Sequence, residues 1–444
     1  MSEYKRPSND IEFDENFSQI HPVMNDTEAA YESARCLFCY DAPCINACPT
    51  SIDIPLFIRQ INTGNINGAA KTIYGANHVG NACGKVCPTE VLCEGACVYN
   101  HQDVKPIEIG KLQNYATNHV IDNNIGLFQK AALNNHKVAV IGAGPGGISC
   151  ACELSMHGYQ VTIFEAKSEG TGLILHGVAP YKITNKESLD EITYLQNQFG
   201  FDIQYDRVIE TKEDIEMIES QYDAVYLGIG LGNTNSINLP GEELDNCIGA
   251  TEFIEHLKLD HKSAFVGNNV VVLGGGNTAM DAASESARMG AENVFLAYRR
   301  NAESMGAYDF EFDLAKGVGV KGLFNLAPVQ IIGDEKVEAI QFINTEESNG
   351  ELKVVPGTEF ELPCDLVIMA TGQSKQIGFL SKLSGVETDE QGRILVDETF
   401  RCGNSIYFAG GDAVNGGMEV VNAVADGKVA ANSIDSFIKE KSNN

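Results

Sequence analysis

Eight of the 13 cysteines in this chain of 444 residues lie between positions 36 and 97, in two runs of four. The first run is Cys36, Cys39, Cys44 and Cys48, followed by Pro49; the second is Cys83, Cys87, Cys93 and Cys97, with Pro88 after Cys87. Thiolates at this spacing suit tetrahedral-sulfur metals or iron–sulfur clusters, and in ferredoxins a cysteine before proline often ligates the other cluster. Zinc is the structural alternative, but such gaps with proline behind them are not those of an ordinary zinc knuckle. The runs predict two 4Fe-4S clusters.

The other five cysteines are scattered, and isolated cysteine usually behaves as a small buried hydrophobe. They are Cys150, Cys152, Cys247, Cys364 and Cys402. The N-terminal stretch lacks the apolar core of a secretory signal, and cytosolic thiols are kept reduced. We therefore expect a cytoplasmic protein whose cysteines bind metal or are structural.

A glycine turn from Gly142 to Gly147 matches G-x-G-x-x-G between an expected strand, 137–141, and an expected helix, 147–158. Gly142 permits the tight turn, Gly144 lets the backbone approach a pyrophosphate, and Gly147 allows the helix to pack on the strand. Glu165 ends a second expected strand, 160–165, where its carboxylate can accept hydrogen bonds from ribose hydroxyls. An unrelated glycine turn is the alternative, which the flanking strands and Glu165 disfavour. This arrangement predicts an FAD site.

A second piece of the same site is expected near the end of the sequence. Gly411 and Asp412 follow an apolar run and precede a helix expected from Gly417 onward, so a carboxylate and a helix N-terminus can meet the dinucleotide. Further candidate cofactor-binding positions are Pro145, Gly172, Leu173, Gly372, Glu419 and Val420.

A second glycine turn predicts a nicotinamide site. Residues 274–279 have the G-x-G-x-x-A form between expected strands at 269–273 and 293–298, and its candidate contacts are Gly274, Gly276, Asn277 and Thr278. The second strand is followed by Arg299 and Arg300 instead of an acidic residue, and an arginine pair can hold a 2′-phosphate. Surface ion pairs are the other interpretation of these arginines, so the choice between NAD and NADP stays open.

These elements imply an α/β protein with one dinucleotide domain inserted into another. We expect a helical iron–sulfur domain at residues 1–130, in which the first 25 residues form a loosely held arm. Doubly wound domains follow, for FAD at 131–232 and 371–444 and for NAD(P) at 233–370. The net charge of −30 excludes a polyanion partner such as nucleic acid, and no apolar stretch is long enough to span a bilayer.

The cysteine region resembles the N-terminal region of dihydropyrimidine dehydrogenase. The resemblance rests on residues 34–44, 48–54, 83–97 and 106–113, and it extends to the bacterial NAD-dependent flavoprotein subunit and, more distantly, to the small subunit of glutamate synthase. It implies that one cluster takes Cys36, Cys39, Cys44 and Cys97, and that the other takes Cys48, Cys87, Cys93 and Gln113. Cys83 would then be a non-ligand. A neutral glutamine in place of a thiolate changes the cluster charge and hence its potential.

The flavin-site pattern departs from the family at two positions. Relatives commonly carry a double glycine and then an arginine, whereas this chain has Thr171 before Gly172, and Lys182. Lysine keeps the charge but loses the planar fork, so we rank Lys182 as a weaker flavin contact.

The resemblance implies the electron-input subunit of a dihydropyrimidine dehydrogenase. Hydride would pass from NAD(P)H to FAD, and single electrons would pass through the clusters to an FMN-containing partner that reduces uracil or thymine. We expect that partner on another polypeptide, in a hetero-oligomer, and we assign no catalytic acid in this chain. The alternatives are a glutamate synthase small subunit and a thiol-disulfide reductase. The second would need a C-x-x-C pair in residues 233–370, which hold only Cys247 and Cys364.

Overall fold

The computed structural model describes residues 4–348 and 351–443. The chain divides into two compact units. The larger unit contains Ile20–Leu175, Lys182–Leu231 and the residues from Lys375 onward. The smaller unit contains the residues up to Gln19, His176–Tyr181 and Gly232–Ser374. Among the described residues, no helix is both long and apolar enough to cross a membrane.

The first part of the larger unit is helical. Its helices are α2 (Asp26–Arg35), α3 (Pro43–Asn46), α4 (Ile54–Asn62), α5 (Ile66–Ala76), α6 (Gly80–Val86) and α7 (Ile109–Asp122), with the short 3-10 turn η1 (Val98–Gln102). Asp53 caps α4, and the apolar residues at positions 54, 57, 58 and 61 place one buried stripe on that helix. Five cysteines from both runs contact the core that this stripe helps to form: Cys36, Cys44, Cys48, Cys93 and Cys97.

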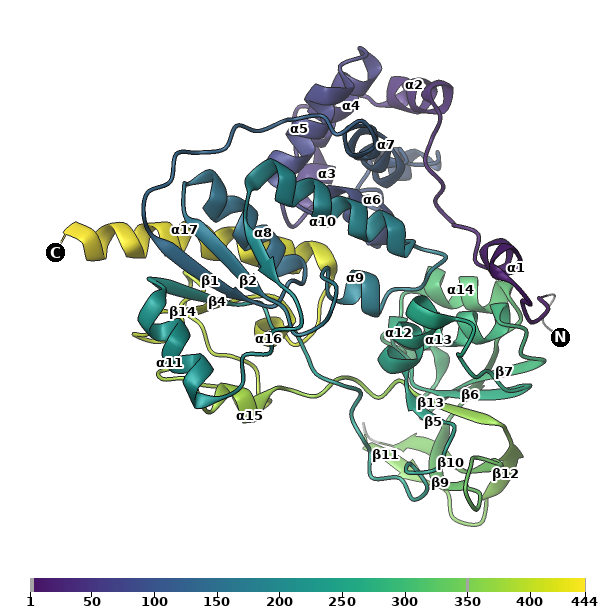
Figure 1. Ribbon diagram of the computed structural model, residues 1–444. Helices are drawn as coiled ribbons and strands as arrows, with labels where there is room; N and C mark the ends of the chain where they lie inside the picture. The colour runs from purple at the N-terminus through teal and green to yellow at the C-terminus, as the bar shows by residue number, and fades with distance from the viewer. Residues whose placement is uncertain (1–3, 349–350, 444) are drawn as a thin grey trace. The chain divides into compact units, whose positions relative to one another are not determined.

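A five-stranded parallel sheet forms the rest of the larger unit, in the order β14-β4-β1-β2-β3. Its strands are β1 (Lys137–Ile141), β2 (Gln160–Phe164), β3 (Asp202–Gln204), β4 (Ala224–Leu227) and β14 (Tyr407–Ala409). The associated helices are α8 (Pro145–Met156), α9 (Leu173–His176), α10 (Asn185–Phe199), α11 (Lys212–Gln221), α15 (Ile377–Leu380), α16 (Asp412–Asn415) and α17 (Val420–Asn443). Because β14 pairs with β4, the C-terminal segment completes the sheet that the first segment begins (Figure 1).

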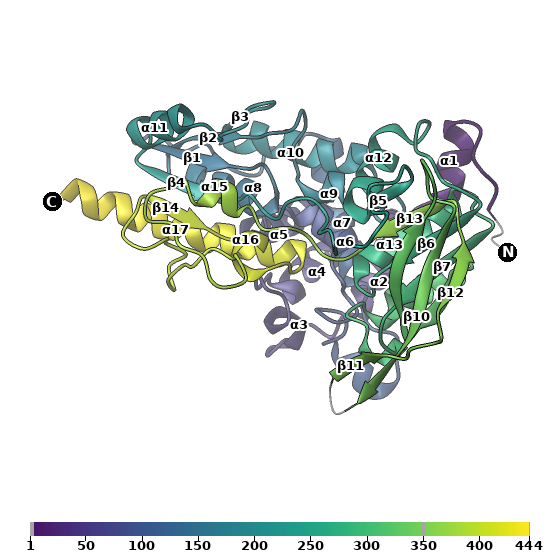
Figure 2. The same ribbon diagram turned by 90° about the horizontal axis from the view of Figure 1, so that it is seen from below.

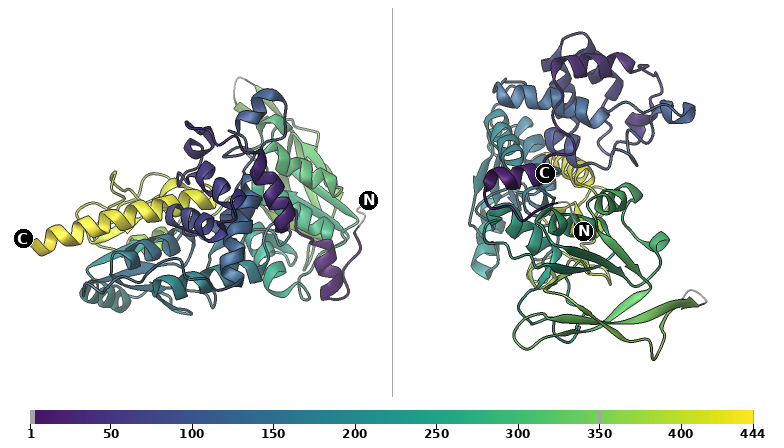
Figure 3. Two further views of the ribbon diagram at one scale, coloured as in Figure 1. Left: turned by 90° about the horizontal axis from the view of Figure 1, so that it is seen from above. Right: turned by 90° about the vertical axis from the view of Figure 1, so that its right-hand side faces the viewer.

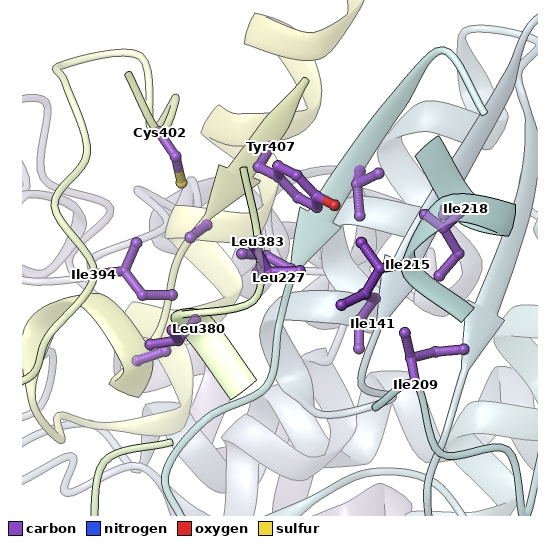
Figure 4. Packing of buried hydrophobic residues seen from close by; sticks show 14 of the residues in the cluster. Ile141, Ile209, Ile215, Ile218, Leu227, Leu380, Leu383, Ile394, Cys402 and Tyr407 are labelled. Carbon is purple, nitrogen blue, oxygen red and sulfur yellow. The ribbon is translucent and has the colours of Figure 1, made fainter. Parts of the chain in front are cut away.

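Two kinds of packing hold this sheet and its helices together: an apolar cluster between the strands and α11, and a close approach of the two helices α8 and α17. Ile141, Leu227 and Tyr407, from three adjacent strands, pack with Ile215 and Ile218 of α11 (Figure 4). On α17, a Cβ added at Gly427 would lie 2.1 Å from the Gly146 oxygen of α8, so only glycine allows this approach of the two helices. Figure 3 shows α17 along its whole length.

The smaller unit has its own parallel sheet, in the order β5-β13-β6-β7-β8, and an antiparallel extension. The parallel strands are β5 (Cys247–Gly249), β6 (Asn269–Leu273), β7 (Asn293–Tyr298), β8 (Lys321–Phe324) and β13 (Leu366–Met369). The extension is β9 (Leu326–Ile332), β10 (Ala339–Ser348), β11 (Glu351–Val354) and β12 (Phe360–Pro363), in which β10 pairs with the other three strands (Figure 2). The helices are α12 (Ala250–Asp260), α13 (Asn277–Arg288) and α14 (Asp309–Gly317), with the turn η2 (Ala302–Ser304).

The loosely held N-terminal arm is the prediction that the structure contradicts. Residues Asp10–Asn16 form helix α1, whose Phe13 ring stacks on His261 with ring centroids 4.0 Å apart. Asn16 and Arg288 exchange two hydrogen bonds of 2.7 Å between side chains and backbone oxygens. The polar composition of the arm concealed these contacts because their partners lie more than 240 positions away in the sequence.

Candidate functional site

The three glycines of the first turn have three different surroundings. Gly142 has a φ of +99°, and a Cβ there would lie 2.5 Å from the Gly228 oxygen. A Cβ at Gly147 would lie 2.0 Å from the Gly142 oxygen, because α8 packs directly on the turn. At Gly144 the nearest atom to an added Cβ is 3.9 Å away. Gly144 is therefore the one of the three whose side-chain space no protein atom occupies.

The turn opens directly into a helix N-terminus. Gly144 is the N-cap of α8 and Pro145 is its first residue, two residues earlier than the expected start at Gly147. Proline at the first helical position suits its fixed φ and its missing N–H. The free backbone N–H groups of this first turn, together with the helix dipole, form a site for an anion such as a pyrophosphate.

Glu165 lies beside this turn. Its carboxylate accepts hydrogen bonds from the backbone N–H groups of Ala143, at 2.7 Å, and Lys167, at 2.9 Å. Each carboxylate oxygen has a second lone pair for a ligand hydroxyl. The loop before α9 also reaches the turn, because a Cβ on Gly172 would lie 2.9 Å from the Gly144 Cα.

Leu173 begins α9 in this loop, and Lys182 is buried. The structure thus brings Gly172 to the turn. The flavin roles of Leu173 and Lys182 stay predictions.

The C-terminal segment reaches the same sheet edge but begins its helix later than expected. Gly416 and Gly417 have φ values of +90° and +118°, so they separate the short α16 from α17, which starts at Val420 directly after Glu419. The Gly411 N–H donates to Asp426 at 2.9 Å, and the Met418 N–H donates to Asp412 at 3.1 Å. Burial raises the pKa of both carboxyl groups. Asp426 is a supporting residue that no local motif indicated.

The second glycine turn, at residues 274–279, also has one glycine with open space beside it. A Cβ on Gly276 would meet no protein atom within 4 Å, whereas one on Gly274 would lie 2.4 Å from the Ala370 oxygen. Gly276 is the N-cap of α13, which contains Thr278, and Asn277 accepts a hydrogen bond from the Tyr308 N–H at 3.0 Å. A second anion site is thereby formed in the smaller unit.

Two features flank this second site. Arg299 is exposed and Arg300 half-buried, and within the described part of the chain neither guanidinium forms an ion pair. Their role as contacts to a 2′-phosphate stays a prediction. Gly372 lies in the segment after β13, where its oxygen accepts a hydrogen bond from the Asn235 N–H at 2.8 Å. Its role as a cofactor contact stays a prediction.

The cysteines of the two runs are intermixed in space. Burial, and then the neighbouring Cys36 and Cys97, raises the pKa of the Cys44 thiol to about 12. Burial raises the pKa of Cys36 too, with smaller contributions from Cys39 and Cys97. Cys97, from the second run, is therefore a neighbour of two cysteines of the first, Cys36 and Cys44.

The cysteines of the second run likewise have a neighbour from the first run. A hydrogen bond with Cys83, followed by burial and by the neighbouring Cys93 and Cys48, raises the pKa of the Cys87 thiol well above its usual range. The pKa of Cys93 is raised by burial, by the adjacent Glu94 and by Cys48. Cys48, from the first run, is thus a neighbour of the second, and Cys44 of the first run also neighbours Cys93. Spacing alone gave two self-contained runs, whereas in the structure members of the two runs lie beside each other. The division of the ligands between two clusters stays a prediction.

Gln113 is buried on α7, next to the helix that leads to Cys87. Its side-chain nitrogen donates to the Gly80 oxygen, the first residue of α6, at 2.7 Å. With the nitrogen engaged, the side-chain oxygen is the atom that remains for coordination. Cys83 is also close, through its hydrogen bond with Cys87, so the choice between Gln113 and Cys83 as the fourth ligand stays a prediction.

The donor set of the two groups is dominated by thiols. Thiolates are the ligands of 4Fe-4S clusters, and in each cluster every thiolate binds a different iron. The residues present therefore fit iron–sulfur ligation.

The two cysteines of the smaller unit do not resemble a redox pair. Burial raises the pKa of Cys247 to about 11 and that of Cys364 to about 12. The thiolate is the reactive form, and reactive cysteines have a lowered pKa. These values argue against the thiol-disulfide reductase alternative.

Comparison with known families agrees with this geometry. Residues 13–125 match the family described as dihydropyrimidine dehydrogenase domain II, 4Fe-4S cluster. Residues 136–427, well over half of the chain, match the pyridine nucleotide-disulphide oxidoreductase family. The chain belongs to the pyridine nucleotide-disulphide oxidoreductase family. As a member that also carries an iron–sulfur domain, it is an NAD(P)H-dependent oxidoreductase that binds FAD, NAD(P) and a 4Fe-4S centre.

Curated relatives match over nearly the whole chain. The glutamate synthase [NADPH] small chain of Escherichia coli is 33% identical and covers 95% of this chain and 94% of its own. The NAD-dependent dihydropyrimidine dehydrogenase subunit PreT of the same species is 29% identical and covers 95% and 97%. FprA from Mycobacterium tuberculosis in complex with NADPH shares the fold, with a TM-score of 0.57, 20% identity, and coverage of 69% of this chain and 86% of its own.

Proposed function

We propose that the chain is the electron-input subunit of an NAD(P)H-dependent dihydropyrimidine dehydrogenase in the cytoplasm. Hydride passes from NAD(P)H to FAD, and electrons leave singly through two 4Fe-4S clusters to an FMN-containing partner that reduces uracil or thymine. The observation that carries this proposal is that Cys97 of the second run neighbours Cys36 and Cys44, while Cys48 of the first run neighbours Cys87 and Cys93. These contacts between the runs are compatible with the ligand division that the dihydropyrimidine dehydrogenase resemblance implies.

Each part of the chain has a separate task in this reaction. The open Gly144, the α8 N-terminus and Glu165 bind and orient FAD, with Asp412 and the α17 N-terminus completing the site. The open Gly276 and the arginines at 299 and 300 bind the nicotinamide dinucleotide, and the arginine pair favours NADP by the chemistry of its guanidinium groups. Bound FAD supplies the conversion of a two-electron hydride into single electrons.

The iron–sulfur ligands are divided between two groups. One cluster is held by Cys36, Cys39, Cys44 and Cys97, and the other by Cys48, Cys87, Cys93 and Gln113. The neutral glutamine makes the second cluster less negative than four thiolates would. Because a less negative cluster is easier to reduce, the two clusters differ in potential and electrons have a preferred direction.

A glutamate synthase small subunit is the second candidate. It is favoured by the identity of 33% to the E. coli small chain, against 29% to PreT. The two candidates share the FAD, nicotinamide and iron–sulfur parts, so they differ only in the partner and its substrate.

One experiment separates them. The protein is purified anaerobically, its iron, acid-labile sulfide and flavin are quantified, and it is titrated with NADH and with NADPH. The loaded protein is then combined with candidate partner subunits and assayed with uracil, or with glutamine and 2-oxoglutarate. We expect about eight iron atoms and one FAD per chain, and turnover with uracil. Turnover only with glutamine and 2-oxoglutarate would replace the first candidate by the second, and zinc without iron would end both.

A further inference from the structure

A buried carboxylate lies where the cysteine helices meet the first dinucleotide sheet within the larger unit. Glu191, on α10, is 2% exposed. One carboxylate oxygen accepts hydrogen bonds from the Asn81 N–H at 2.6 Å and the Tyr74 hydroxyl at 3.1 Å, and the other from the Ala82 N–H at 2.9 Å. Glu191 thus connects α10 to the first turn of α6.

No cation neutralises this carboxylate in the part of the chain that the structure describes. The nearby cation Lys85 pairs with Glu187, one turn before Glu191 on α10. His78, whose pKa is lowered by burial, forms a 2.9 Å hydrogen bond with Glu153 instead. Burial without a cation disfavours the charged form. The pKa of Glu191 is accordingly raised to about 7.

The other titratable groups that face Glu191 are neutral at that pH. They are the hydroxyl of Tyr74, on α5, and the thiol of Cys152, on α8. Burial raises the pKa of both groups well above their usual values. Glu191 is therefore the group at this junction whose charge changes near neutral pH.

The helix that Glu191 caps leads to the second cysteine group. From Ala82 to Cys87 is five residues, about 8 Å at the helical rise of 1.5 Å per residue. The same helix start is bound by Gln113 through the Gly80 oxygen. A charge on Glu191, at the start of α6, is therefore close enough to influence a charge on a cluster held by Cys87, after the end of α6, in a buried, low-dielectric setting.

Glu191 also borders a small cavity of about 10 Å³, near the lower limit for one water molecule. Its polar lining is Glu191, Ser188 and Thr171, and the Thr171 hydroxyl is buried without a hydrogen-bond partner. Thr171 directly precedes Gly172, which packs on the Gly144 backbone. The cavity therefore gives Glu191 a polar neighbour on the side of the first glycine turn.

We propose that Glu191 is a redox-linked proton site, which binds one proton when an electron reaches the second cluster and releases it when the electron leaves. The inference rests on the proposed function. A hydride carries two electrons and one proton, whereas iron–sulfur clusters accept electrons alone, so one proton per hydride is released in this half of the molecule. In the coupled step the cluster gains one electron while the carboxylate and one proton form the carboxylic acid, so the local charge is unchanged.

The test is a redox titration of the anaerobically purified holoprotein, followed by electron paramagnetic resonance at several pH values on either side of 7. We expect the reduction potential of the second cluster in the wild-type protein to fall as pH rises. The fall should be at most about 59 mV per pH unit, which corresponds to a tenfold change in a one-electron reduction equilibrium. Glu191→Gln should reduce this slope markedly. The dependence that remains is expected from Glu94, which adjoins Cys93 and whose pKa burial also raises to about 7. Glu153→Gln is the matched control, because Glu153 is buried on the neighbouring α8 but has a lowered pKa and should leave the slope unchanged.

The outcomes separate this inference from the proposed function. Absence of iron and sulfide from the wild-type protein removes both. Intact clusters with a wild-type potential independent of pH, or a Glu191→Gln variant that keeps the wild-type slope, overturn the proton site alone. If Glu191→Gln does not load its clusters, Glu191→Asp keeps a titrating carboxylate and should keep the slope with a displaced midpoint. An Asp variant with a flat potential would equally refute the proposal.

Discussion

Substituting Gly144 by alanine separates cofactor binding from folding. The added Cβ would meet no protein atom closer than 3.9 Å, and the backbone angles of Gly144, φ −75° and ψ 178°, are available to alanine. Gly144 is also the N-cap of α8, where alanine is worse than glycine by about 0.5–1 kcal/mol. We therefore expect the apoprotein to fold, with a loss of at most about 1 kcal/mol in its free energy of unfolding.

The cost to FAD binding should be much larger. The methyl group would fill the space through which the turn backbone approaches the pyrophosphate. Displacing the anion by this amount removes one or two charge-assisted hydrogen bonds, each worth about 1.5–3 kcal/mol. A total of about 2–4 kcal/mol corresponds to roughly a 30- to 1,000-fold increase in the Kd for FAD.

Gly276→Ala is the matched control. Gly276 is equally open and is likewise an N-cap, so its alanine variant has the same capping cost but should bind FAD normally and lose affinity for NAD(P)H. Gly147→Ala should instead fail to fold, because its Cβ would lie 2.0 Å from the Gly142 oxygen. Flavin content, the Kd from flavin fluorescence, and thermal unfolding of the apoprotein measure these effects. Wild-type FAD affinity in Gly144→Ala would refute the assignment of the first turn.

Three further predictions follow from the same structure. Gln113→Ala should remove about half of the bound iron, one of two equal clusters, while Cys83→Ser keeps it. Iron analysis measures both, and the reverse pattern would make Cys83 the ligand. Replacing Arg299 and Arg300 by alanine should raise the KM for NADPH about 10- to 100-fold and leave that for NADH unchanged; equal changes would contradict a 2′-phosphate contact. Glu191→Gln should abolish a pH dependence of stability. The folded pKa of about 7 exceeds the unfolded value of 4.5, so the folded state binds more protons between these values and wild-type stability falls as pH rises through them. The glutamine amide nitrogen cannot accept one of the hydrogen bonds that the carboxylate accepts, which costs about 1–3 kcal/mol at every pH. Relative to wild type, the variant should recover at most about 3 kcal/mol between pH 4.5 and a pH above 7. Urea unfolding at the two pH values tests this, and an equal difference from wild type at both would contradict it.

Elements defined by local sequence were predictable. The expected strands at 137–141, 269–273 and 293–298 have the predicted boundaries as β1, β6 and β7. The tight-turn role of Gly142 and the packing role of Gly147 also agree with their surroundings. A strand, a tight turn and a helix start are set by side-chain alternation and backbone sterics over a few residues. That information lies within the segment itself.

Helix starts were less predictable where an extra turn intervenes. The helix expected from Gly417 begins at Val420, because positive φ values at Gly416 and Gly417 first turn the chain away from α16. Glycine permits such a conformation without requiring it. The packing of α17 against α8 determines which conformation is adopted.

The sequence by itself therefore determined the two glycine turns, their flanking strands and the cysteine-rich region, since each depends on neighbours along the chain. Only the tertiary structure decided that cysteines of the two runs lie beside each other, that α1 packs within the smaller unit, and that Glu191 lies buried against α6. The physical reason is that burial and electrostatic neighbours depend on segments far apart in sequence: Glu191 and Ala82 are 109 positions apart. A carboxylate on an ordinary helix becomes a candidate proton site only when another helix removes it from water.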